Sequence, residues 1–175
     1  VLESFFNPAL FNKINYNDSP YAKNFIKLIN NNESSTISPV FGGHTAQAEF
    51  EVLCGFPVTK DNVKFERQLI NEVPCLPHIL ADKGYKTIVS HPNVPVFWNR
   101  INAYRNIGFQ TYYSKDDFLL DDMNQEFLSD SSLYRQVLEK IANNLNNFSN
   151  NLNNYDPNNN LNNTNNNIFF MFFPC

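Results

Sequence analysis

Hydrophobic residues along the chain occur in two alternating patterns, compact runs and helix-spaced sets. Short runs rich in β-branched and aromatic residues, bounded by Gly, Pro or Asn, predict strands. Sets with apolar residues three or four positions apart predict helices. The expected strands are 1–6, 35–41, 85–91, 109–114 and 167–175, and the expected helices are 21–29, 46–53, 76–83, 97–106 and 130–145.

The alternation of strands and helices predicts an α/β fold. A strand that returns through a helix to the next strand forms a parallel sheet with helices packed on it. Gly84 directly follows the expected helix 76–83, in the position typical of a helix C-terminus, and strand 85–91 comes next. We therefore expect a largely parallel sheet flanked by helices.

Length and composition narrow the classes of protein. The 175 residues, 42% of them hydrophobic, suit about one domain with a sizeable core. The net charge is −4 and the basic residues are scattered, which argues against a nucleic-acid partner. No apolar run reaches the ~20 residues that span a bilayer, and no signal peptide is recognised. Because the chain starts at Val1 in strand-like sequence and stops in another such run, we expect a piece truncated at both ends.

An asparagine-rich segment separates the last expected helix from the last expected strand. From Ala142 to Asn167, 16 of 26 residues are Asn. A segment of this composition buries too little apolar surface to offset its ordering entropy. We predict a disordered insertion at about 142–167, between the last expected helix and the last expected strand.

The three cysteines, Cys54, Cys75 and Cys175, lack C-x-x-C spacing. This spacing argues against a structural zinc site and against a disulfide framework. We expect Cys54 and Cys75 to be buried free thiols, and a bridge between them is the alternative in an oxidising compartment.

Polar residues follow three of the expected strands. They are Glu3 with Ser4, the segment 42–45 and the segment 90–93. The carboxyl ends of parallel strands share one edge of a sheet, where open α/β sheets bind ligands. We therefore expect these three polar clusters to converge.

The sequence Gly42-Gly43-His44-Thr45 suits a phosphate-binding turn. Glycines allow a sharp turn and a close approach of the backbone to a ligand. Thr45 would begin a helix, whose free N–H groups and positive dipole end favour an anion. A threonine hydroxyl is a weak nucleophile unless a base or metal activates it, and Glu3 could share a divalent cation with it. The alternative is a plain N-cap threonine after a glycine turn.

The segment Trp98-Asn99-Arg100 offers a second set of candidate binding residues. An arginine fork matches phosphate oxygens, and an indole supplies a flat wall for a polyol. A core aromatic beside a solvated arginine is the alternative. His44 and His91 could be ligands or proton donors, or structural histidines.

Several motifs together resemble a known family. "LESF", "SPVFGGHTAQAEFEVLCG", "LPHILADKGYKT", "HPN" and "FWNR" occur in the order seen in lipoteichoic acid synthases and related membrane phosphoglycerol transferases. These enzymes belong to the alkaline phosphatase/sulfatase superfamily. The resemblance covers roughly residues 1–140 and the final strand, and it implies an alkaline phosphatase-like fold. It also implies that residues 1–175 are the N-terminal part of a sulfatase-like catalytic domain.

The resemblance also implies residue roles. Glu3 would be a metal ligand, and Thr45 both the nucleophile and a metal ligand. The metal would be Mn²⁺ or Mg²⁺, as oxygen-rich ligation favours. Trp98 and Arg100 would line the pocket for a phosphoglycerol head group. The further candidates for substrate binding are His44, His91 and Asn93.

The implied reaction is a double displacement. The threonine attacks a phosphatidylglycerol-like donor, diacylglycerol leaves, and the phosphoglycerol passes to a hydroxyl of a glycan or polymer. The resemblance places the catalytic domain on the extracytoplasmic side of the cell membrane, attached through segments outside this chain.

Departures from the family keep alternatives open. The family completes its metal site with an adjacent Asp-His pair, and no such dipeptide occurs here. One alternative is a sulfatase or phosphatase-type hydrolase, although Cys75-Leu76-Pro77-His78 lacks the arginine of the sulfatase motif C-x-P-x-R. A phosphoethanolamine transferase would use the same threonine. A catalytically inactive fragment is the third alternative.

Overall fold

The computed structural model describes residues 11–21, 23, 26–27, 44–58, 64–67, 69–153 and 167–172. The strands expected at 1–6 and 35–41, and most of the helix expected at 21–29, lie outside the described residues. In chain order, the elements that position the site are α2 (Thr45–Cys54), α3 (Lys64–Arg67), α4 (Leu76–Asp82), β1 (Lys86–Ser90), the 3₁₀ turn η2 (Phe97–Asn99), α5 (Arg100–Asn106), β2 (Thr111–Tyr113), η3 (Lys115–Asp117), β3 (Met123–Asn124), β4 (Phe127–Leu128), α6 (Asp130–Asn153) and β5 (Ile168–Phe172).

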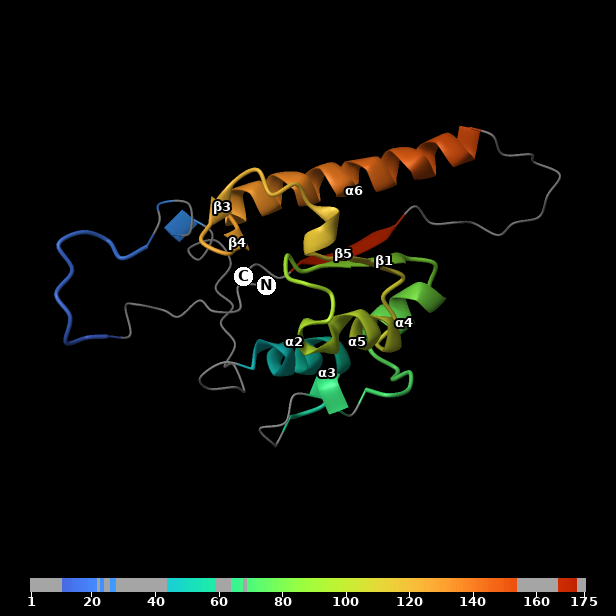
Figure 1. The fold of residues 1–175 in the computed structure, drawn as a ribbon, viewed down its shortest axis with the longest axis horizontal. Coiled ribbons are helices and arrows are strands. Elements are labelled where there is room, and N and C mark those ends of the chain that lie inside the picture. Colours follow the sequence, from blue (N-terminus) through green and yellow to red (C-terminus); the bar gives the residue numbers. More distant parts are fainter. Residues whose placement is uncertain are drawn as a thin grey trace.

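Three parallel strands form a sheet in the order β2-β1-β5. Figure 1 shows β5 beside β1. The parallel pairing that the alternating pattern predicted is confirmed for these strands. In the register, Ser90 at the end of β1 lies opposite Tyr113 of β2 and Phe172 of β5. The carboxyl ends of the three strands are therefore level, and the residues that follow β1 emerge at this edge.

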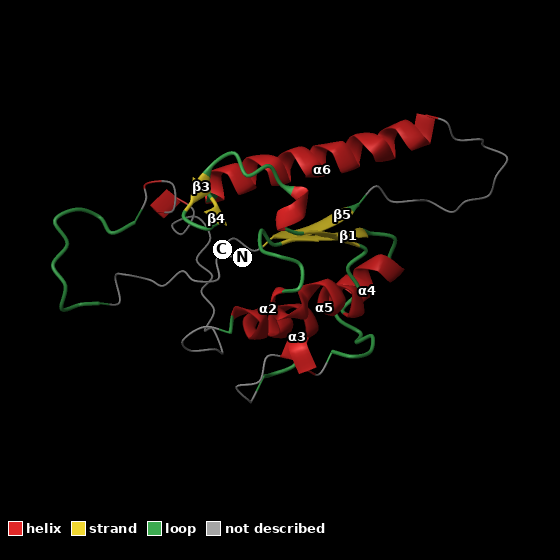
Figure 2. Cartoon of the chain, in the orientation of Figure 1, coloured by secondary structure: helices red, strands yellow, loops and turns green. Residues whose placement is uncertain are grey.

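Helices cover both faces of the sheet, with α2 to α5 on one side and α6 on the other (Figure 2). Alternate residues of β5 point to opposite faces, as expected for a strand. Phe169 and Met171 pack against the core cluster that includes residues of α2, α3 and α5. Phe170 packs against the cluster beneath α6, with Leu133 and Val137. The α/β layering predicted from the sequence is confirmed.

Glycines mark the helix ends, as the sequence indicated. Gly55 ends α2 with φ +70°, and its N–H donates to the carbonyl oxygen of Glu51 at 2.9 Å. Gly84, with φ +85°, follows α4. After α5, Gly108 has φ +102°, and a Cβ at this position would lie 2.5 Å from the backbone nitrogen of His78. Only glycine fits there, which lets α4 and the turn after α5 approach closely.

The disorder predicted for 142–167 is wrong at its beginning. Helix α6 continues to Asn153, so the first part of the Asn-rich segment is helical, and residues 154–166 lie outside the described residues. The Asn144 side chain links α6 to the sheet. It accepts a hydrogen bond from Lys86 Nζ at 2.6 Å and donates one to the Tyr113 hydroxyl at 3.2 Å. None of the described helices has the length and apolar character needed to cross a membrane.

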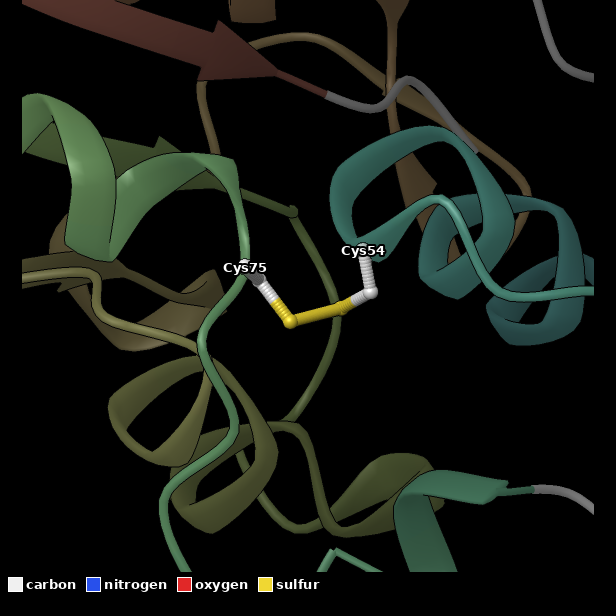
Figure 3. The surroundings of a disulfide bond; sticks show 2 residues. All are labelled: Cys54 and Cys75. Carbon is white, nitrogen blue, oxygen red and sulfur yellow. A yellow bond between two sulfur atoms is a disulfide. The ribbon is translucent and has the colours of Figure 1, made fainter.

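The expectation of two free thiols is also wrong. Cys54 at the end of α2 and Cys75 just before α4 form a disulfide (Figure 3), with their Cα atoms 4.2 Å apart. The two residues are 21 positions apart in sequence. Packing of α2 and α4 on the same side of the sheet brings them together, a tertiary effect that the cysteine spacing alone did not indicate.

Candidate functional site

Thr45 is the first residue of α2. The N-cap is His44, which has left-handed backbone angles (φ 61°, ψ 42°) and makes no side-chain capping hydrogen bond. The alternative of Thr45 as a plain N-cap is therefore wrong. The Thr45 side chain is half-buried, and its hydroxyl has no hydrogen-bond partner among the described residues. His44 is exposed, and Glu3, Gly42 and Gly43 lie outside the described residues.

The cluster after β1 lies at the carboxyl edge of the sheet. The backbone N–H of His91 donates to the carbonyl oxygen of Tyr113 at 3.0 Å, which extends the β1–β2 pairing by one residue. His91 is 4% exposed, and burial, followed by the positive charge of Arg100, lowers its pKa to about 3. The imidazole is therefore neutral at neutral pH. The Asn93 side chain accepts a hydrogen bond from the N–H of the adjacent Val94 at 2.7 Å.

Two consecutive non-glycine residues adopt left-handed backbone angles before α5. They are Trp98 (φ 53°, ψ 29°) and Asn99 (φ 55°, ψ 27°). This conformation costs energy for most side chains and is concentrated at functional sites. The Asn99 side chain stabilises the turn, because it donates to the carbonyl oxygen of Phe65 at 2.9 Å and accepts from Asn102 at 2.7 Å. The helix expected at 97–106 is therefore split into η2 and α5.

Arg100 begins α5 and is fully buried, so the alternative of a solvated arginine is wrong. Its Nη2 pairs with Glu49 Oε1 of α2 at 2.5 Å, and its Nε donates to the Tyr104 hydroxyl at 3.1 Å. The Tyr104 hydroxyl in turn donates to Glu49 Oε2 at 2.8 Å. These three hydrogen bonds close a ring of buried polar groups between α2 and α5.

Burial and the interactions within this ring shift the pKa values of Arg100 and Tyr104. Burial alone would lower the pKa of Arg100, but the charge of Glu49, followed by Tyr104, outweighs burial and raises it further above its ordinary value. Burial, followed by the charge of Glu49, raises the pKa of Tyr104 well above its usual range. Arg100 is therefore charged, and Tyr104 is a neutral phenol that donates a hydrogen bond to Glu49.

The aromatic rings of η2 complete the surroundings of the guanidinium. Arg100 Cζ lies 5.0 Å from the centroid of the Trp98 ring and 5.6 Å from that of Phe97. Cation–π contacts of this kind are stronger where water is excluded. The two rings stack on each other at 4.8 Å. Trp98 and Arg100, which the sequence suggested as partners, are thus in contact.

The arrangement brings several predicted residues to one region. Glu49 lies four residues after Thr45, so the two share a face of α2, and Glu49 binds Arg100. Side chains alternate along a strand, so His91 faces the same side of the sheet as Val89, which packs in the core cluster with Tyr104 of α5. The side chains of His44 and Asn93 are not joined to Arg100 by any described contact. Glu49 and Tyr104 were not predicted, although a carboxylate at the apolar-facing position 49 was a usable signal.

Comparisons with known proteins agree with this fold. The family described as Sulfatase matches residues 1–152, and the chain belongs to the sulfatase family. Over 133 residues it is 31% identical to the lipoteichoic acid synthase of Staphylococcus aureus, and the matched region covers 70% of this chain and 20% of that protein. Over 141 residues it is 28% identical to a protein of Rhizobium meliloti named for cyclic beta-1,2-glucan modification, covering 79% of this chain and 21% of that protein. The chain spans about a fifth of the length of these relatives.

Two solved structures share the fold. A lipoteichoic acid synthase from Listeria monocytogenes has a TM-score of 0.64 at 21% identity, with 79% of this chain and 30% of that chain covered. A protein in the alkaline phosphatase superfamily from Vibrio parahaemolyticus has a TM-score of 0.55 at 16% identity, with 74% of this chain and 28% of that chain covered. The predicted family resemblance and the alkaline phosphatase-like fold are confirmed.

Proposed function

We propose that this chain carries part of the active site of a metal-dependent phosphoglycerol transferase of the lipoteichoic acid synthase type. The observation that carries the proposal is the position of Thr45. Its hydroxyl is half-buried at the N-terminus of the ten-residue helix α2, without a hydrogen-bond partner among the described residues. Helix N–H groups and the helix dipole favour a phosphate beside it. The similarity to lipoteichoic acid synthases supports the same assignment.

The donor set at Thr45 suits a hard divalent cation. The unpartnered hydroxyl is an oxygen donor, as Mg²⁺ and Mn²⁺ prefer, and Glu3 is the proposed second ligand. Among the described residues no group of three His, Cys, Asp or Glu side chains could hold a metal. Glu3 is outside the described residues. When bound, the cation would lower the pKa of the threonine hydroxyl.

The reaction proceeds in two displacements at phosphorus. In the first, Thr45 Oγ forms a bond to the phosphorus of a phosphatidylglycerol-like donor, and the bond to the diacylglycerol oxygen breaks. The threonine proton leaves with diacylglycerol. In the second, a hydroxyl of a glycan or polymer attacks the same phosphorus, the threonine ester bond breaks, and a proton returns to Thr45. A covalent intermediate of this kind divides one difficult step into two easier ones.

The other predicted residues act on the head group in this proposal. Arg100 supplies a fixed positive charge for the phosphodiester, and Trp98 supplies an apolar wall for the glycerol. His91 is neutral near neutral pH and can share a hydrogen bond without adding charge. His44 and Asn93 remain candidates for contacts at the edge of the pocket.

The proposed location is the extracytoplasmic side of the cell membrane, with attachment through segments outside this chain. The Cys54–Cys75 disulfide supports this side, because disulfides persist mainly in oxidising compartments. The donor would be the head group of a membrane phospholipid, and no nucleic-acid partner is proposed.

The test uses the full-length protein with Mn²⁺ and phosphatidylglycerol that carries a labelled diacylglycerol. Thr45→Ala should abolish the release of diacylglycerol, whereas Thr45→Ser, which keeps a hydroxyl, should retain measurable turnover. Unchanged turnover in Thr45→Ala would remove Thr45 as the nucleophile.

The products separate the alternative functions. Release of free glycerol phosphate in the presence of an acceptor glycan would indicate a hydrolase. Preference for phosphatidylethanolamine would indicate a phosphoethanolamine transferase. Absence of turnover in the wild type with every donor would indicate an inactive protein.

A further inference from the structure

We propose that Glu49 and Tyr104 are positioning residues that fix the guanidinium of Arg100 and leave its Nη1 for the phosphate oxygen of a phosphodiester. The inference rests on the proposed function, in which Arg100 binds the head group, and it assigns two residues that contact Arg100 rather than the substrate. It also gives the buried ring between α2 and α5 a role beyond stability.

The geometry of the ring accounts for two of the three guanidinium nitrogens. Nη2 is held by Glu49 Oε1 at 2.5 Å and Nε by the Tyr104 hydroxyl at 3.1 Å. The remaining nitrogen, Nη1, is buried and has no hydrogen-bond partner in the part of the chain that the structure describes. Buried donors are nearly always paired, and those of a charged group especially so. An unpaired Nη1 therefore indicates a place for an acceptor.

A second group indicates the same location. His91 Nδ1, just past the carboxyl end of β1, is also buried without a partner among the described residues. Side chains alternate along a strand, so His91 faces the same side of the sheet as Val89, which packs in the core cluster with Tyr104 of α5. The charge of Arg100 contributes to the lowered pKa of His91, in agreement with this placement. A neutral imidazole can donate a hydrogen bond to phosphate. Arg100 Nη1 and His91 Nδ1 thus both lack partners that a phosphate could supply.

The charge of Glu49 indicates the class of phosphate. Glu49 and Arg100 carry opposite charges and are in direct contact, so the pair is close to neutral as a unit. Both side chains are at most 1% exposed, so water does not screen a charge added beside them. A monoanionic phosphodiester adds one charge to this pair, whereas a dianionic phosphomonoester adds two. The pair therefore favours the diester, which is the linkage found in a phospholipid head group.

Trp98 lies beside the guanidinium that the ligand would contact. Arg100 is fully buried, and the half-buried Trp98 ring lies against its guanidinium. A ligand bound at Nη1 would therefore change the surroundings of this ring. Trp98 is the single tryptophan of the chain, so its fluorescence reports on this event.

The experiment follows Arg100 by NMR in protein labelled with ¹⁵N-arginine and uses glycerophosphoglycerol, a soluble phosphodiester, as the probe. In the wild type, the locked guanidinium should give separate Nη1 and Nη2 signals. The probe should shift Nη1 more than Nη2 and change the Trp98 emission. A wild-type Nη1 signal that the probe does not shift would overturn the inference, whether or not any variant folds.

Tyr104→Phe tests the positioning role. It removes one of the two groups that fix the guanidinium and should weaken glycerophosphoglycerol binding by about tenfold, the loss expected for a hydrogen bond to a charged group. It should also merge the Nη1 and Nη2 signals, an effect that a merely structural role would not produce. The matched control is Tyr85→Phe, a half-buried tyrosine that is outside the ring and should bind like the wild type. Equal affinity of Tyr104→Phe and wild type would overturn the inference.

The two proposals fail in distinguishable ways. A wild-type protein that binds glycerophosphoglycerol through Nη1 but does not turn over phosphatidylglycerol would refute the proposed function and leave the inference intact. A protein that turns over phosphatidylglycerol with an unchanged kcat/KM in Tyr104→Phe would refute the inference alone.

Discussion

Replacing Glu49 or Arg100 singly should destabilise the protein far more than replacing both. The two side chains are at most 1% exposed and form an ion pair. Glu49→Met leaves the Arg100 charge buried without its counter-charge, and Arg100→Met does the same to Glu49. Removal of one partner of a buried pair costs about 3–5 kcal/mol, because the remaining charge is desolvated and unpaired.

The double variant Glu49→Met/Arg100→Met removes both buried charges. If the two losses were independent, they would add to about 6–10 kcal/mol. The double variant instead leaves only the Tyr104 hydroxyl without its two partners, which costs about 1–3 kcal/mol. We therefore expect the double variant to be more stable than either single variant.

Urea unfolding at pH 7, followed by circular dichroism, measures these differences in the free energy of unfolding. The matched control is Glu66→Gln, an exposed glutamate of α3, which should change stability by less than about 0.5 kcal/mol. A double variant that lost the sum of the two single losses would show that the residues act independently, and it would refute the coupling described here.

Two further predictions concern pH and redox state. Because burial and Arg100 lower the pKa of His91 from 6.5 to about 3, the unfolded chain binds an extra proton between these values. The free energy of unfolding should therefore fall as pH drops through this window, by up to about 1.4 kcal/mol per pH unit. Urea unfolding at pH 5 and pH 7 measures this change, and the change should be smaller in His91→Gln than in the wild type. An equal change in the two proteins would contradict the lowered pKa of His91. The variant Cys54→Ala/Cys75→Ala should lose about 3 kcal/mol, given the 21-residue separation. Reductant should lower the thermal unfolding temperature of the wild type and leave that of the double cysteine variant unchanged. An equal decrease in both proteins would count against the disulfide.

Local sequence patterns were sufficient to predict most of the described elements. Helix α2 follows from the apolar spacing of Ala46, Phe50 and Leu53 and from Gly55, since each of these signals acts within a few residues. Strand β1 follows in the same way from its β-rich run after Gly84. The parallel arrangement of the strands followed from the alternation of element types.

Features that depend on distant contacts were not predictable from the same patterns. Asn144 belongs to a segment of low helix propensity, and its contacts with Lys86 and Tyr113 exist only once α6 lies on the sheet. Arg100 was recognised as a candidate phosphate ligand, but its burial depends on Glu49, which is 51 residues away in sequence. The sequence therefore indicated which residues carry the chemistry and left their mutual contacts to the tertiary structure.

The disulfide between α2 and α4 has a practical consequence for obtaining the protein. A bacterial cytosol keeps thiols reduced, so a protein expressed there would accumulate with Cys54 and Cys75 unpaired. Export to the periplasm, or a host with an oxidising cytosol, should give the cross-linked molecule. Purification buffers should omit dithiothreitol and phosphines, because the helix that carries Thr45 at one end is covalently anchored at the other.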